Sequence, residues 1–219
     1  MSAYLLGILI YLIVWAILYL LKPKTRKLQL FGSLLLLPFG LLDIWFRPNY
    51  WNPPLLIKAI EPLSLETFLF CFAAGGIAIV FGSFFIKNKD FKMQLISYKK
   101  LMLFFSLGFG IYALFDIFTD FAEMNNLNYS FLIIWIFLLV LNLKENWKSL
   151  IPALIFAIFT IIAVNLGLIF YPSFVAQYWN LKRMWPLFMN TPLEEVFFGG
   201  ILTALWILLP KYLYKNRCK

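Results

Sequence analysis

Long apolar segments, separated by short stretches that carry most of the charges, constrain this chain more than any other feature. A membrane-spanning helix needs about 20 predominantly apolar residues. Of the 219 residues, 63% are hydrophobic and 13% are charged, whereas a soluble domain is about half apolar and about a quarter charged. The sequence therefore predicts one all-α, polytopic membrane domain over residues 1–219, with seven helices. The expected helices span residues 4–21, 28–45, 65–86, 101–121, 127–143, 150–170 and 194–209.

The distribution of lysine and arginine predicts how the bundle is oriented. Of the 19 basic residues, 15 fall in the first, third and fifth connections and in the C-terminal tail. Basic-rich and basic-poor connections thus alternate, and the basic ones face the cytoplasm. We expect a multi-pass protein of the cell membrane, with its N-terminus outside and its C-terminus in the cytoplasm. This placement explains the net charge of +9 without a nucleic-acid partner.

Several function classes are excluded by what the chain lacks. It contains no histidine, which excludes histidine-ligated di-iron and haem centres and a Ser-His-Asp triad. Cys71 and Cys218 have no metal-site or disulfide spacing. No aspartate-rich magnesium motif or nucleotide-binding loop is present, so we expect neither a metal nor a cofactor. A retinal protein would need a lysine in the last helix, and residues 194–209 contain none.

Most acidic residues gather toward the predicted outer ends of the helices. Surface-loop charge is a sufficient explanation for those in the connections. An ionisable residue within a membrane helix is costly, however, and usually faces a cavity or a partner. We therefore interpret the acids that adjoin long apolar runs as candidate functional residues: Asp43, Glu66, Asp116, Glu194 and Glu195.

Two parts of the sequence share three features in the same order, which suggests an internal duplication. Each has a long aromatic-rich connection, followed by a helix that opens with Leu65-Glu66 in the first part and Leu193-Glu194 in the second. Upstream, Asp43 corresponds loosely to Asn165. We expect two parallel three-helix repeats related by an axis along the membrane normal. The repeats would cover about residues 1–90 and 127–214, joined by a linking helix at about 100–121.

Each expected half-site combines a carboxyl group at a helix N-terminus with nearby aromatic rings. A carboxyl group in apolar surroundings can stay protonated and act as a general acid, although a helix N-terminus favours the charged form. Aromatic faces can stabilise a carbocation. Glu194 and Glu195 point about 100° apart on a helix, so we expect only one of them to face the cavity. Together these groups suit the protonation of a hydrocarbon double bond.

The motifs in the second half are Pro192-Leu193-Glu194-Glu195-Val196-Phe197-Phe198, and those in the first half are Asp43, Trp45, Trp51-Asn52-Pro53 and Leu65-Glu66-Thr67-Phe68-Leu69-Phe70. Together these motifs resemble the membrane lycopene cyclases of the heterodimeric and fused carotenoid-cyclase type, over nearly the whole chain. The chain departs from the family at Ser64, where the first signature usually has proline, and at Thr67, where it usually has a second glutamate.

The resemblance implies cyclisation of the linear end of a polyene through a carbocation, with no net redox change. It implies that Glu194, Glu195 and Glu66 serve as acid and base, and that Asp43 supports them. The implied substrate-lining residues are Trp45, Trp51, Asn52, Asn165, Trp179 and Trp185.

Two alternatives stay open at this point. The chain could cyclise another isoprenoid, such as a meroterpenoid, or it could bind or transport a lipid or an ion without catalysis. If the chain is a carotenoid cyclase, its expected partners are a hydrophobic polyene substrate and membrane lipid. The sequence does not define an oligomeric state.

Overall fold

The computed structural model describes residues 3–47, 49–54, 58–60, 63–85, 96–180 and 185–214. These residues form a mostly helical bundle, and seven of the helices are long and apolar enough to cross a membrane. The all-α bundle with seven apolar helices is thereby confirmed. The seven candidate spans are Tyr4–Leu21, Pro23–Phe46, Leu65–Ser83, Tyr98–Phe118, Glu123–Leu141, Leu143–Phe170 and Leu193–Leu213.

Long helices, short helical pieces and two small hairpins make up the described part of the chain. The long helices are α1 (Ala3–Leu21), α2 (Arg26–Leu36), α4 (Leu65–Ser83), α5 (Tyr98–Phe118), α6 (Glu123–Leu141), α8 (Leu150–Phe170) and α10 (Leu193–Leu213). The short pieces are η1 (Pro23–Thr25), η2 (Leu37–Leu42), α3 (Asp43–Phe46), α7 (Leu143–Asn146), η4 (Trp147–Ser149) and α9 (Phe174–Tyr178). The antiparallel strand pairs are β1 (Lys58–Ile60) with β2 (Leu63–Ser64), and β3 (Leu187–Phe188) with β4 (Thr191–Pro192).

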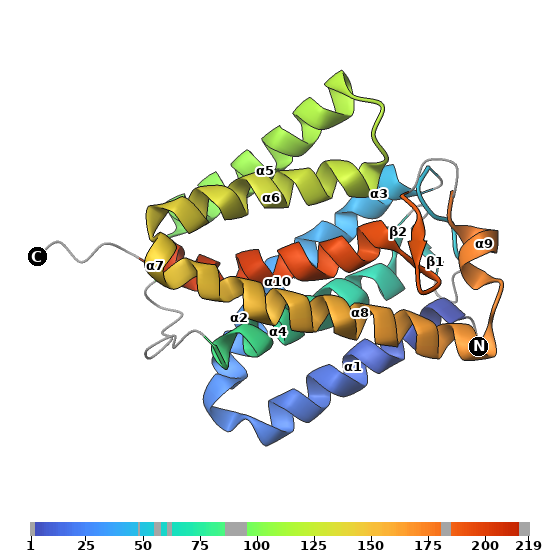
Figure 1. Ribbon diagram of the computed structural model, residues 1–219, viewed down its shortest axis with the longest axis horizontal. Helices are drawn as coiled ribbons and strands as arrows, with labels where there is room; N and C mark the ends of the chain where they lie inside the picture. Colours follow the sequence, from blue (N-terminus) through green and yellow to red (C-terminus); the bar gives the residue numbers. More distant parts are fainter. Residues whose placement is uncertain are drawn as a thin grey trace, which may run out of the picture.

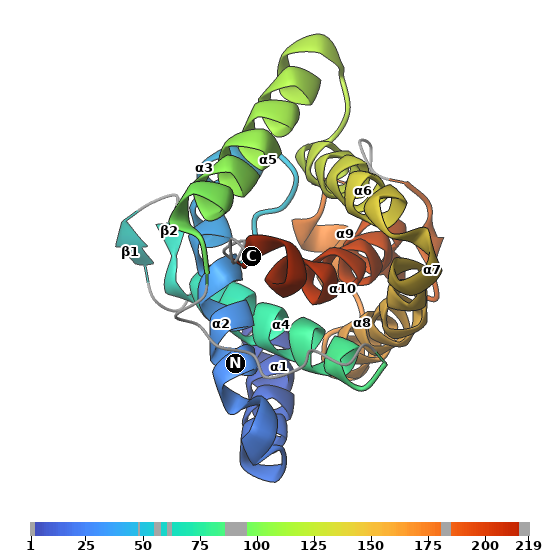
Figure 2. The same ribbon diagram turned by 90° about the vertical axis from the view of Figure 1, so that its left-hand side faces the viewer.

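The core of the bundle lies along α10, which contacts α4, α6 and α8 (Figure 2). Leu202, Leu205 and Trp206 on α10 are fully buried. Helices α2 and α4 approach closely because Gly32 faces Gly75, and a Cβ on Gly32 would lie 2.6 Å from the Gly75 carbonyl oxygen. Small residues commonly allow such close packing between membrane helices.

The outer surface of the bundle is apolar, most clearly along α5. Side chains that point outward from this helix include Met102, Leu114, Ile117 and Phe118, all of them exposed. A soluble monomer rarely presents so large an apolar surface. A lipid environment explains it, because hydrocarbon chains would cover these side chains.

The two ends of the bundle differ in structure (Figure 1). One end gathers the start of α1, the short helices α3 and α9, and both hairpins, and the opposite end carries α7 and the C-terminal end of the described chain. Each hairpin leads directly into a long helix, β2 into α4 and β4 into α10. The first turns of α4 and α10 therefore lie at the hairpin end.

The second span is interrupted just before this end. Helix α2 ends at Leu36 and continues as the 3₁₀ segment η2, which contains Pro38 near its start. Proline lacks the backbone N–H that a continuous α-helix would use. The chain then forms α3, whose first residue is Asp43. The break brings the Asp43 carboxyl group against Ser64, the residue that precedes α4.

Candidate functional site

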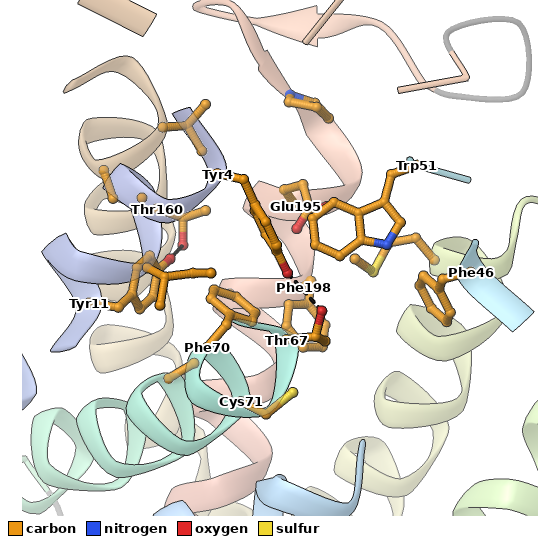
Figure 3. Close-up of a pocket in the computed structure, with 18 of the residues that line it drawn as sticks. Tyr4, Tyr11, Phe46, Trp51, Thr67, Phe70, Cys71, Thr160, Glu195 and Phe198 are labelled. Carbon is orange, nitrogen blue, oxygen red and sulfur yellow. Dashed lines mark hydrogen bonds between the residues drawn. The ribbon is translucent and has the colours of Figure 1, made fainter. Parts of the chain in front are cut away.

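A cavity of about 160 Å³ lies inside the bundle near the hairpin end. Its walls come from α1, α4, α8 and α10, with contributions from η2, α3, α6, α9 and β4. Two loops also contribute, one after α3 that carries Trp51 and one after α9 that carries Trp179, and we call them the aromatic loops. The lining is almost entirely apolar and rich in aromatic rings. Figure 3 shows Glu195, Tyr4 and Thr67 pointing toward one another inside this apolar wall. The cavity thus encloses a few polar groups within surroundings suited to a hydrocarbon.

Glu195 in the first turn of α10 brings a carboxyl group to the cavity. The Tyr50 hydroxyl donates a hydrogen bond of 3.2 Å to Glu195 Oε1. Burial, together with the nearby Glu195 and Glu194 carboxyl groups, raises the pKa of Tyr50 well above its ordinary value. Tyr50 is therefore a neutral hydrogen-bond donor at physiological pH. The Trp179 indole lies near both side chains, but its N–H donates no hydrogen bond to the described residues.

Asp43 brings a second carboxyl group, which is 2% exposed. Its Oδ2 accepts hydrogen bonds from the Ser64 hydroxyl at 2.9 Å and from the Ser64 backbone N–H at 3.3 Å. Ser64 caps α4, because its Oγ accepts the Thr67 backbone N–H at 3.1 Å. The hydroxyl oxygens of Ser64 and Thr67 are 2.8 Å apart, and those of Thr67 and Tyr4 are 2.7 Å apart. A continuous series of hydrogen bonds therefore joins Asp43 to Tyr4.

The two aromatic loops pair with each other through Trp51 and Trp179. These residues form an isolated antiparallel bridge, their ring centroids are 5.4 Å apart, and both line the cavity. The Asn52 N–H donates to the Tyr178 carbonyl at 2.8 Å, and the Asn180 N–H donates to the Tyr50 carbonyl at 2.9 Å. The pairing is reciprocal, because each loop contributes a donor on one side of the bridge and an acceptor on the other side.

The paired loops carry the same tripeptide. Residues 50–52 and 178–180 both read Tyr-Trp-Asn, 128 positions apart, which is also the spacing from Leu65-Glu66 to Leu193-Glu194. Thr67 and Glu195 share this spacing, and both line the cavity. Two pairs of residues with this spacing, Trp51 with Trp179 and Thr67 with Glu195, therefore line one cavity.

Glu194 and Glu66 are buried but lie outside the cavity wall. The Glu194 side chain is 0% exposed, and its Oε1 accepts a hydrogen bond from the Trp185 backbone N–H. Since successive helical residues point about 100° apart, a helix that turns Glu195 to the cavity turns Glu194 away from it. Glu66 holds the corresponding position in α4. The structure therefore brings together Glu195 and Asp43 of the four expected catalytic residues.

Of the six expected substrate-lining residues, Trp51 and Trp179 line the cavity and four do not. Trp45 is 48% exposed on the outside of the bundle. Asn52 contributes its backbone to the loop pairing. The Asn165 side chain donates to the Met189 carbonyl at 2.8 Å and to Thr191 Oγ1 at 3.1 Å, which ties the second hairpin to α8.

Trp185, the fourth of these residues, contacts the rings of Tyr129 and Phe197 as well as Glu194. These contacts hold the segment before the second hairpin against α6 and α10. Trp185 therefore packs against the helix that carries Glu195 rather than lining the cavity itself.

The sequence patterns indicated no role for four residues of the site: Tyr4, Tyr50, Ser64 and Thr67. The repeated Tyr-Trp-Asn tripeptide was the available signal for Tyr50. No local pattern marks Tyr4, which lies in the first apolar run and is 63 positions from its partner Thr67. In the described part of the chain, no three His, Cys, Asp or Glu side chains are grouped so that they could hold a metal ion.

Comparison of the chain with protein-family models, with curated proteins and with solved structures found no match. The function is therefore inferred from the cavity and its residues.

Proposed function

We propose that this chain is a membrane enzyme that closes a ring at the linear end of a polyene, by acid–base chemistry and without redox change, and that it is a divergent relative of the membrane lycopene cyclases. The observation that carries the proposal is the position of Glu195, a carboxyl group at an aromatic-lined cavity inside an apolar bundle. General acids contribute about 10²- to 10⁴-fold to catalysed rates.

The reaction begins with Glu195 in its protonated form. The π electrons of the terminal double bond take the Glu195 proton, which leaves a carboxylate and a tertiary carbocation. The π electrons of an internal double bond then attack the cation and close a six-membered ring, which moves the positive charge into the ring. A base removes a proton from the adjacent carbon, and the electrons of that C–H bond form the new double bond.

Aromatic rings around Glu195 suit the charged intermediate. Trp51, Phe70, Trp179 and Phe198 line the cavity, and aromatic faces attract cations, most strongly where water is absent. The hydrogen bond from neutral Tyr50 stabilises the Glu195 carboxylate that is left after proton transfer. The apolar walls also keep water away from the carbocation, which would otherwise be converted to an alcohol.

The volume of the cavity fits one end of a long substrate. About 160 Å³ is smaller than the roughly 300–1,000 Å³ of pockets that enclose a drug-sized ligand. We infer that the cavity receives the reacting end of an isoprenoid chain, while the rest of the chain lies among helices or lipid. A carotenoid precursor and a quinone-linked isoprenoid both meet this description.

We also infer that the chain arose by duplication and that the cavity lies toward the outer face of the cell membrane. The constant spacing of 128 residues, the reciprocal Trp51–Trp179 pairing and a strand pair before both α4 and α10 support two parallel repeats. The basic-rich connections support an N-terminus outside and a C-terminus in the cytoplasm. Since α1 begins at the hairpin end, the cavity would then open near the outer surface.

The proposal is tested by supplying lycopene to liposomes that contain the purified protein. We expect a ring-closed product of unchanged hydrogen count, and one deuterium per ring in a single turnover of protein that has been equilibrated in D₂O. Glu195→Gln should lower the rate by at least about 100-fold. The control is Glu145→Gln, because Glu145 is exposed at the opposite end, where it pairs with Lys211 at 2.7 Å.

Two results would contradict the proposal in different ways. If folded protein binds lycopene without forming any ring, a carrier or binding protein becomes the better explanation. If a ring-closed product forms only when a shorter or quinone-linked isoprenoid is supplied, the chemistry stands and the carotenoid assignment is wrong.

A further inference from the structure

Tyr4, Thr67, Ser64 and Asp43 form what we call the hydroxyl chain, a series of hydrogen bonds that begins at the cavity and ends at a buried carboxyl group. The successive oxygen–oxygen distances are 2.7 Å from Tyr4 to Thr67, 2.8 Å from Thr67 to Ser64, and 2.9 Å from Ser64 to Asp43. All four residues are buried. Tyr4, Thr67 and Asp43 line the cavity, whereas Ser64 lies behind its wall.

The direction of these hydrogen bonds follows from the number of protons available. An ionised carboxylate can only accept, and a hydroxyl group has a single proton to donate. If Asp43 is ionised, Ser64 donates to Asp43, Thr67 donates to Ser64, and Tyr4 donates to Thr67. The Tyr4 oxygen then presents its lone pairs to the cavity. In this state the hydroxyl chain can accept a proton at the cavity wall, through the Tyr4 oxygen.

We propose that the hydroxyl chain is the base of the cyclisation reaction, with Tyr4 accepting the proton from the ring cation and Asp43 storing it. This inference rests on the proposed function and identifies its second catalytic group. Tyr4 takes the proton from the carbon next to the cation, and the electrons of that C–H bond become the new double bond. Tyr4 passes its own proton to Thr67, Thr67 passes its proton to Ser64, and Ser64 passes its proton to Asp43.

Every hydroxyl oxygen in the hydroxyl chain gains one proton and loses one, so only Asp43 changes its charge. Glu195 loses one proton during the same turnover. The cycle closes when a proton returns from Asp43 to Glu195, because the reaction as a whole neither consumes nor releases protons. The reverse order of hydrogen bonds, which exists when Asp43 is protonated, carries a proton back to Tyr4 at the cavity wall, and Glu195 lines the same cavity.

The hydroxyl chain also gives Thr67 a role. Thr67 and Glu195 occupy corresponding positions in the two halves, 128 residues apart, and both line the cavity. With threonine at this position, the first half has no carboxyl group in the first turn of α4 that faces the cavity. Asp43 of α3 supplies one instead, through Ser64 and Thr67. The two halves thereby differ in function, with an acid in one and a base in the other.

The test uses three variants that break the hydroxyl chain at different points: Tyr4→Phe, Thr67→Val and Asp43→Asn. Each is assayed in liposomes with lycopene at saturating concentration, and both the rate and the identity of the products are measured. We expect about 100-fold slower formation of the normal product, with substrate affinity within about twofold of the unmodified protein. We also expect diverted products, because a cation without its base loses a different proton or is captured by water.

Product identity separates a catalytic role from a structural one. A variant that only loosens the fold would bind less substrate or lose activity, but it would keep the normal product ratio. The control is Tyr212→Phe, which removes another hydroxyl group, one that donates to the Leu138 carbonyl at 3.2 Å at the far end of the bundle. This control should keep both the rate and the product ratio.

The inference is overturned if folded Tyr4→Phe or Thr67→Val makes the normal product at the unmodified rate. It is also overturned if these variants lose affinity while the maximal rate and the product ratio stay the same, since that pattern indicates binding alone. Because each variant breaks the hydroxyl chain independently, a result from any one that folds decides the matter. If the unmodified protein binds lycopene without cyclising it, the proposed function fails first and the base assignment fails with it.

Discussion

The Tyr50 hydroxyl and the Glu195 carboxyl group are 145 positions apart in the chain and are joined by a hydrogen bond of 3.2 Å. Tyr50 is fully buried in the first aromatic loop, and Glu195 lies in the first turn of α10. The contact ties the loop after α3 to the first turn of α10. It also gives the Glu195 carboxylate a donor that stays neutral.

Tyr50→Phe should slow cyclisation without changing the product. The substitution keeps the ring, which packs edge-on against Phe46 at 5.8 Å, and removes the donor to Glu195. We expect about 10-fold lower turnover and a loss of about 1 kcal/mol in the free energy of unfolding, as for a typical hydrogen bond. Turnover in liposomes and thermal unfolding in detergent measure the two effects. Tyr98→Phe is the control, since Tyr98 is 78% exposed.

Tyr50 should also contribute to destabilisation at alkaline pH. An unfolded tyrosine ionises with a pKa of about 10, whereas burial holds the pKa of Tyr50 in the folded protein well above that value. Above pH of about 10, the unfolded state therefore binds fewer protons than the folded state, and stability falls as pH rises. Stability of Tyr50→Phe measured from about pH 9 to 12 should fall less steeply than that of the unmodified protein. Equal slopes would contradict the burial argument.

Glu194→Ala should lower the stability of the fold while affecting the cyclisation reaction much less. Glu194 lies outside the cavity, and its Oε1 accepts the Trp185 backbone N–H. Without this acceptor the partly buried N–H loses its partner, which costs about 1 kcal/mol. We expect a lower unfolding temperature with an unchanged product ratio. If Glu194→Ala folds normally and abolishes cyclisation while Glu195→Gln does not, the assignment of the acid to Glu195 is wrong.

Gly7→Leu should block the cavity while leaving the fold intact. Gly7 lines the cavity, and a Cβ at this position would meet no atom within 4 Å. A leucine side chain therefore has room to enter the space that the substrate would occupy. We expect at least about 10-fold weaker binding of lycopene, or about 1.4 kcal/mol, measured by quenching of tryptophan fluorescence. Gly110→Leu is the matched control, because a Cβ there also meets no atom within 4 Å and Gly110 lies on α5, outside the cavity.

The expected membrane orientation can be tested with cysteines at the two ends of the bundle. Ser173→Cys lies at the hairpin end and Lys148→Cys at the opposite end, and both positions are exposed. In a chain with Cys71 and Cys218 replaced by alanine, a membrane-impermeant maleimide should label Ser173→Cys on intact cells. Lys148→Cys should be labelled only after permeabilisation. The reverse pattern would place the N-terminus and the cavity on the cytoplasmic side.

The first turn of α10 shows how far the sequence predicts the site. The sequence alone identified a pair of acids at a helix N-terminus and indicated that Glu194 and Glu195 would not both face one cavity. The choice between them depends on how α10 is rotated about its axis, and that rotation is set by packing against α4, α6 and α8. Helices that are apolar on all sides carry no periodicity that reveals their inward face, which is why the choice required the structure.

The tryptophans illustrate the same limit. Trp45 and Trp51 lie in one aromatic stretch, yet Trp45 points outward and Trp51 lines the cavity opposite Trp179. The backbone bridge between the two loops decides which indole enters the site, and this bridge is a long-range contact that neither loop specifies alone.

The sequence by itself determined that the chain forms seven apolar helices, because a bilayer requires long uncharged segments and these are visible residue by residue. It also determined that acids gather toward one end. Only the tertiary structure decided that Glu195 and Asp43 share a cavity, and that Tyr4 connects to Asp43 through Thr67 and Ser64. The physical reason is that these contacts depend on helix rotation, on the break at Pro38 and on loop pairing, and each of these is fixed by packing between segments far apart in the chain.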